Sequence, residues 1–142
     1  MRIKGIARIL GITILAAMIV AFTVPTVFAS DDNISFKFRI GILQTNGQDP
    51  NGRFRQTTNP QNPWKVKLTS HSQGEGSYAI FWLEGADNSN VSPDRTVRLG
   101  KPAVYTTAYA SANKRTVYLT GENLNYVAAA YTVGGLWDEE TA

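Results

Sequence analysis

One alternating run sets the architecture of this chain: Ile34-Ser35-Phe36-Lys37-Phe38-Arg39-Ile40-Gly41-Ile42. Apolar residues occupy every second position, so an extended strand would place all of them on one face. A helix of 3.6 residues per turn would scatter the same side chains around its circumference. The run therefore predicts an antiparallel strand with one buried face and one solvated face.

Short runs of the same kind follow, separated by turn signals such as Asn46-Gly47 and Asn59-Pro60. The run over 77–83 is apolar on both faces, which is typical of a central strand covered on both sides. No stretch indicates a helix, and the spacing predicts an all-β fold, a single antiparallel β-sandwich of about seven or eight strands. The further strands are expected at 53–56, 64–69, 77–83, 96–99, 103–110, 116–120 and 126–133.

The first 29 residues have the pattern of a secretory signal peptide. Three basic residues precede an uncharged apolar run over 9–22, and small residues at Val27 and Ala29 precede Ser30. This pattern predicts a signal peptide over 1–29, cleavage between Ala29 and Ser30, and a secreted, extracellular domain over 30–142. The alternative is an uncleaved membrane anchor, which needs about 20 apolar residues and would have to run on through Pro25.

Cleavage would change the charge of the protein. Arg2, Lys4 and Arg8 belong to the signal, so the domain keeps 11 of the 14 basic residues, equal in number to the 11 Asp and Glu. A neutral domain has no basic stripe to neutralise phosphates, which argues against nucleic acid as a partner. Contact with a membrane is expected only transiently, through the signal peptide. The chain has no cysteine, so the domain must be stabilised by packing without disulfides.

The aromatic residues are the best candidates for a binding site. Rings exposed on a sheet can form a platform for a ligand, whereas buried rings simply fill the core. Tyr105 and Tyr109 are four residues apart in an expected strand, so they are predicted to share a face. With Trp64, they form the predicted ligand platform. Phe81 and Trp82 are expected in the core.

No pattern of residues predicts a catalytic, cofactor or metal site. His71 is the only histidine, no G-x-S-x-G elbow accompanies its neighbouring serines, and it is expected at the surface. The loop from Asp87 to Asp94 has oxygen ligands but lacks the spacing of an EF-hand. A glycosidase would need two carboxylates facing each other across a cleft. The acids at Glu75, Glu84, Asp94 and Glu122, and those at 138–140, are instead expected to be scattered and solvated.

Three segments resemble a family of small secreted proteins of unknown function from Gram-positive bacteria. They are Arg53-Phe54-Arg55-Gln56-Thr57-Thr58-Asn59, then Asn62-Pro63-Trp64-Lys65-Val66, then Gly74-Glu75-Gly76. The resemblance covers most of the domain and implies no activity and no site residue. A weaker similarity of size and composition connects the chain to secreted β-sandwich bacteriocins of the lactococcin type, without a shared motif.

The sequence therefore predicts a secreted, non-enzymatic β-sandwich that binds an extracellular or cell-surface partner. Two alternatives stay open. One is a bacteriocin-like antimicrobial factor, and the other is a small carbohydrate-binding module or carbohydrate-active enzyme.

Overall fold

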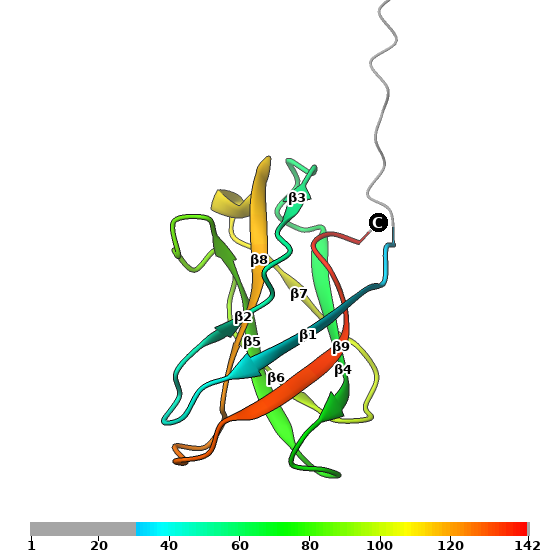
Figure 1. Cartoon of the computed structure of the whole chain (residues 1–142). Helices are drawn as coiled ribbons and strands as arrows, with labels where there is room; N and C mark the ends of the chain where they lie inside the picture. Colours follow the sequence, from blue (N-terminus) through cyan, green and yellow to red (C-terminus); the bar gives the residue numbers. More distant parts are fainter. Residues whose placement is uncertain (1–30, 142) are drawn as a thin grey trace, which may run out of the picture.

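Two antiparallel sheets packed face to face make up the fold (Figure 1). The structure is a computed structural model and describes residues 31–141. The predicted signal peptide and the cleavage site between Ala29 and Ser30 lie outside the described residues. The predicted all-β antiparallel sandwich is confirmed, with nine strands in place of seven or eight.

The first sheet has four strands in the order β1-β9-β4-β7. The alternating run at the start of the domain forms its edge strand β1, which pairs along its whole length with β9. A β-bulge interrupts the pairing of β4 with β9 between Leu68 and Ser70. The bounds of these strands are β1 Ile34–Ile40, β4 Pro63–His71, β7 Val104–Thr107 and β9 Tyr131–Asp138.

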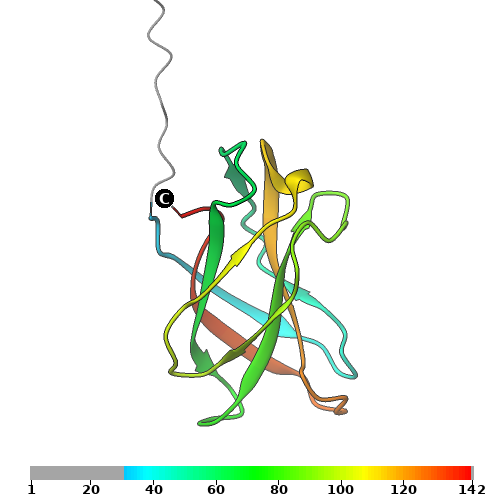
Figure 2. The same cartoon turned by 180° about the vertical axis from the view of Figure 1, so that it is seen from behind.

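The second sheet has five strands, in the order β2-β8-β5-β6 with β3 also paired to β8. Its two long strands, β5 and β8, lie side by side at its centre (Figure 2). A short 3-10 helix, η1, spans Ala110–Ala112 and leads into β8. The strands are β2 Gly47–Gln48, β3 Arg53–Arg55, β5 Tyr78–Gly85, β6 Arg95–Arg98 and β8 Arg115–Glu122.

Alternate residues of the facing strands fill the space between the sheets. Phe36 and Phe38 of β1 meet Phe81 of β5 edge to face, with ring centroids 5.6 and 6.3 Å apart. Such tilted aromatic pairs are favoured by the ring quadrupole, beyond the gain from burial. Trp64 and Trp137 are the largest fully buried side chains of the same core.

The last strand was predicted at 126–133 but spans Tyr131–Asp138, and its bounds were wrong because Gly134-Gly135 has the composition of a turn. Both glycines instead lie in the middle of β9, between β1 and β4. A Cβ on Gly134 would lie 2.6 Å from the Ser70 Oγ, and one on Gly135 would overlap the Lys67 carbonyl. Close approach of neighbouring strands explains these glycines.

The acidic residues after β9 are buried, contrary to the prediction of a solvated tail. The Glu140 carboxylate accepts hydrogen bonds from the backbone N–H groups of Gln56 and Thr57, at 2.8 and 2.7 Å. The fully buried Arg55 guanidinium donates to the Glu139 carbonyl. Paired in this way, the acids fasten the end of β9 to the segment after β3.

Residues 31–141 include no helix long and apolar enough to cross a membrane.

Candidate functional site

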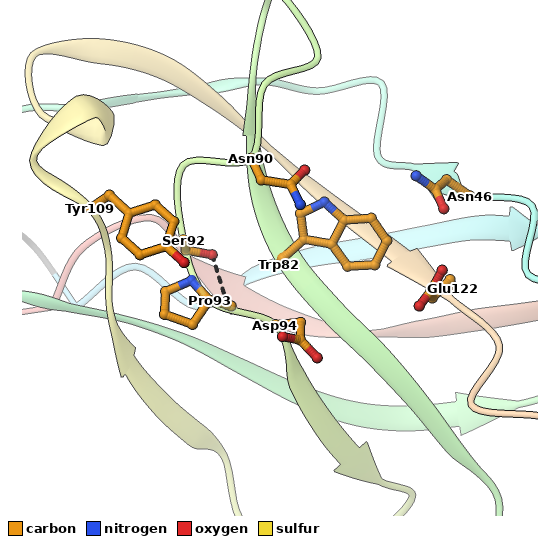
Figure 3. A pocket seen from close by; sticks show the side chains of 8 residues that line it. All are labelled: Asn46, Trp82, Asn90, Ser92, Pro93, Asp94, Tyr109 and Glu122. Carbon is orange, nitrogen blue, oxygen red and sulfur yellow. Dashed lines mark hydrogen bonds between the residues drawn. The ribbon is translucent and has the colours of Figure 1, made fainter.

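A pocket of ≈ 350 Å³ opens on the outer face of the second sheet (Figure 3). Trp82 lies at its centre, and Tyr109 and Glu122 stand on opposite sides of the indole in this view. The segment between β5 and β6 supplies most of one wall. The lining residues are Asn46, Trp82, Asn90, Ser92, Pro93, Asp94, Tyr109 and Glu122.

The alternation of β5 turns Trp82 away from the core. Phe81 and Leu83 belong to the buried cluster between the sheets, so the residue between them points to the opposite face. The indole Nε1–H donates to Oε1 of Glu84, which lies on the same face, at 2.9 Å. Gln48 and Thr120 donate to the other oxygen of Glu84 at 3.0 and 3.1 Å. Glu84 is therefore buried and holds the ring in one orientation.

The wall of the pocket is fixed to the sheet by hydrogen bonds. The Ser92 hydroxyl accepts a hydrogen bond from the backbone N–H of Leu83 at 2.8 Å. Pro93 follows Ser92, and the regular pairing of strands is interrupted there. The Tyr109 N–H donates to the carbonyl of the buried Val91 at 2.9 Å, which brings the start of η1 to the same wall. A site whose walls are held in this way needs little rearrangement to accept a ligand.

Two carboxylates give the pocket its charge. Asp94 and Glu122 both line it, and the lining set contains no Lys, Arg or His. Burial, and then the negative charge of Asp94, raise the pKa of Glu122 above its usual value. Arg95, the nearest cation in sequence, donates instead to the Thr106 hydroxyl and to the Asp94 backbone carbonyl, both at 2.8 Å. The pocket therefore favours a cation or a neutral polar group over an anion.

The structure separates the three residues of the predicted platform. Trp64 was placed there wrongly: it has 0% of its surface exposed and fills the core, because it lies on the inner face of β4. Tyr105 is 57% exposed on β7, opposite Lys65 of the first sheet. Tyr109 is 49% exposed and lines the pocket on the second sheet. The two tyrosines lie apart because β7 ends at Thr107, so the alternation of side chains along the strand does not extend to Tyr109.

Trp82 is the site residue that the sequence did not reveal. The run over 77–83 predicted a strand covered on both faces, and Trp82 is indeed only 5% exposed. The cover on its outer face, however, is the Glu84 network and the pocket rather than a second apolar layer. The one sequence signal that could have indicated a polar environment for Trp82 was Glu84, an acidic residue two positions later and therefore on the same face of the strand.

His71 is buried, in contrast to the surface position expected. Its ring stacks on Tyr131 with centroids 4.3 Å apart, and its Nδ1 accepts the Gln73 N–H at 3.2 Å. Burial lowers the pKa of His71. A shallow hollow beside it is lined by Lys37, Ser70, Ser72 and Thr132. Since no carboxylate lines that hollow, it lacks the acid that a Ser-His-acid arrangement requires.

The remaining acidic and metal candidates lie apart. Asp87 accepts hydrogen bonds from Ser89, which chiefly lower its pKa to about 2, and it pairs with Arg115 at 2.9 Å. Asp94 faces the pocket described above. Within residues 31–141, no group of three or more His, Cys, Asp or Glu side chains is arranged to hold a metal ion.

A family model described as "Protein of unknown function (DUF2712)" matches residues 25–141. No curated protein and no solved structure matches the chain.

Proposed function

Since the chain belongs to the DUF2712 family of proteins of unknown function, we propose from its own residues that it is a secreted, non-enzymatic protein that acts by binding outside the cell or at its surface. The Trp82–Tyr109 pocket is the binding site in this proposal. The export pattern of residues 1–29 supports the extracellular location.

The observation that carries the proposal is the pocket around Trp82. It combines an indole fixed by Glu84 with a half-exposed phenol and with side-chain amides. Ligand sites are concave, and a few placed polar groups in them fix the orientation of the ligand. The volume of ≈ 350 Å³ falls within the range of small-molecule pockets, about 300–1,000 Å³. By contrast, the hollow lined by Arg98, Lys101 and Glu75 contains no aromatic ring.

Two tyrosines provide the test, because one lines the pocket and the other does not. A fragment of residues 30–142, which contains both sheets and their core, is assayed for retention on intact cells and on cell-wall polysaccharide. Tyr109→Ala should weaken retention about tenfold, or ~1.4 kcal/mol. Tyr105→Ala, of comparable exposure but on the first sheet, should leave it unchanged.

Equal effects of the two substitutions, or no retention of the unaltered fragment, would overturn the proposed site. Release of soluble sugars from the polysaccharide would contradict the non-enzymatic assignment. Growth inhibition of other strains that survives Tyr109→Ala would favour the bacteriocin-like alternative.

The pocket also favours the carbohydrate-binding alternative as a second candidate. Aromatic rings beside Asn and carboxylate side chains offer both an apolar face and hydrogen-bond partners for hydroxyl groups. Competition by soluble oligosaccharides in the retention assay would separate a saccharide ligand from a protein partner.

The predicted export has its own test. N-terminal sequencing of protein collected outside the producing cells should begin at Ser30. A membrane-bound form that starts at Met1 would contradict both the cleavage and the extracellular location.

A further inference from the structure

We propose that the Trp82–Tyr109 pocket takes a saccharide that carries a protonated amino group. This inference rests on the binding function proposed above and specifies its ligand. Three features of the pocket carry it: the charge of its walls, the fixed aromatic ring at its centre, and the absence of any cation among its lining residues.

The first feature is a pair of uncompensated carboxylates. None of the ion pairs formed within residues 31–141 involves the side chain of Asp94 or Glu122. Some acids in this part of the chain are paired with cations, as in Asp87 with Arg115 and Glu139 with Arg53, and the buried Glu84 and Glu140 are compensated by hydrogen bonds instead. Two like charges that face one cavity repel each other, and a bound cation between them would relieve that repulsion.

The second feature is the Trp82 indole, which lies between the two sides of the pocket in Figure 3. The ring is nine-tenths buried and locked by its hydrogen bond to Glu84. Its locked orientation costs no entropy when a ligand binds. At the small part of the indole that borders the pocket, the ring quadrupole can attract a nearby cation, whereas a sugar ring would pack on the half-exposed Tyr109. Tyr109 offers a second ring at the mouth.

The third feature concerns what the pocket would reject. Sugars with carboxylate, sulfate or phosphate groups would bring negative charge to two carboxylates with no Lys, Arg or His to compensate. Neutral sugars would not be repelled, but they would gain nothing from the charge of the two carboxylates. The amides of Asn46 and Asn90 can donate to and accept from ring hydroxyls. An amino sugar satisfies all these groups at once.

The test compares two oligosaccharides of equal length: a glucosamine oligomer, which carries protonated amines, and its fully N-acetylated counterpart, in which an acetyl group on each nitrogen removes the charge. Both are titrated into the 30–142 fragment at a pH where the amines are protonated, and tryptophan emission is followed. Trp64 and Trp137 are fully buried in the core, so a change in emission reports on Trp82. We expect the amine form to bind about tenfold more tightly.

Charge-neutralising variants sharpen the comparison. Asp94→Asn and Glu122→Gln should each reduce the preference for the amine form several-fold, and together they should abolish it. Glu75→Gln removes one exposed acid outside the pocket and should leave the preference intact. Added salt should reduce the preference, as expected for partly exposed charges.

Each outcome decides a different point. Equal or tighter binding of the neutral oligomer would overturn the amino-sugar inference and leave the proposed binding function standing. Binding of neither oligomer, together with no retention on cells, would overturn both. A lysine peptide that binds as tightly as the glucosamine oligomer would show that the pocket selects a cation and not a saccharide, which would also overturn the inference.

Discussion

Asp138 shows how a single carboxylate can make the stability of this fold depend on pH. Burial is the main cause that raises the pKa of Asp138 to about 6, and Glu139 adds to the rise, while Lys65 opposes it. The carboxylate accepts the Glu140 N–H at 3.1 Å, but its Oδ2 lies 3.9 Å from the Lys65 Nζ, beyond hydrogen-bond reach. The charged form is therefore under-compensated in the folded protein.

The raised pKa fixes the sign of the pH dependence. Below pH 3.8 Asp138 is protonated in the folded and unfolded states, and its contribution to stability is fully present. That contribution is lost as the pH rises towards about 6, because the unfolded state gives up its proton first. Asp138→Asn should avoid this loss, so its stability relative to wild type should rise by about 2 kcal/mol between pH 4 and pH 7. Denaturant unfolding at the two pH values measures it, and Glu75→Gln should show no comparable rise.

Gly135 must be a glycine because neighbouring atoms leave no room for a Cβ, and not because its backbone requires a positive φ. A Cβ there would overlap the Lys67 carbonyl and lie 3.0 Å from the Phe36 ring. We expect Gly135→Ala to lower the free energy of unfolding by about 3 kcal/mol or more, because backbone must move.

Gly74→Ala is the matched control for this substitution. A Cβ at Gly74 meets nothing within 4 Å, although the residue has a φ of +88°. Its cost should be the conformational one alone, about 1 kcal/mol. If thermal unfolding gives equal costs for the two substitutions, the packing argument for Gly135 is wrong.

At the scale of elements, the segment after β9 acts as a clasp between the two sheets. Arg53 and Arg55 of β3 bind Glu139, and the backbone after β3 binds Glu140. Arg55 is fully buried, and burial is the main cause that lowers its pKa. Without Glu139 and Glu140, the Arg55 guanidinium would keep its hydrogen bonds to the Asn62 carbonyl and to Asn113 but lose the nearby acids that compensate its buried charge.

A chain that stops at Asp138 should therefore unfold more easily than one that includes Glu139 and Glu140. We expect a loss of about 3–5 kcal/mol in the free energy of unfolding, measured by denaturant titration. Arg55→Met in the shortened chain should recover part of the loss, because the unpaired charge is removed. An unchanged midpoint after shortening would show that the acids contribute little.

Across the whole molecule, alternation in the sequence predicts the strands well and the function poorly. The run over 34–42 predicted β1 because its period of two is strict and because Phe36, Phe38 and Ile40 are buried on one face, although the strand ends at Ile40 and Ile42 is exposed. Gly134-Gly135 misled the prediction of β9, since a glycine required by neighbouring strands looks the same in sequence as one required by a turn. The missing information was the tertiary position of β9, which pairs with β1 on one side and with β4 on the other.

The binding site was only partly predictable, for a related reason. Trp64 and Trp82 both occur in strands, and sequence alone does not reveal which tryptophan faces the core. Tyr109 was named as a candidate platform residue and lines the pocket, but its companions Trp82, Asp94 and Glu122 come from other parts of the chain. These residues lie close together only because of the path that the segment between β5 and β6 takes, and no local sequence pattern predicts that path.

The central position of β9 also affects when the protein can fold. Ile34 of β1 lies opposite Trp137, so the first strand of the domain pairs with the strand made last among those described. Within residues 31–141, β1 has no other partner strand. Arg55 likewise must wait for Glu139, its hydrogen-bond acceptor, until the chain has been synthesised beyond β9. While it is still being synthesised, the chain should stay open and sensitive to protease up to residue 130, and close only once β9 has emerged. The fold thus delays its own completion until the last of these strands is available to pair with the first.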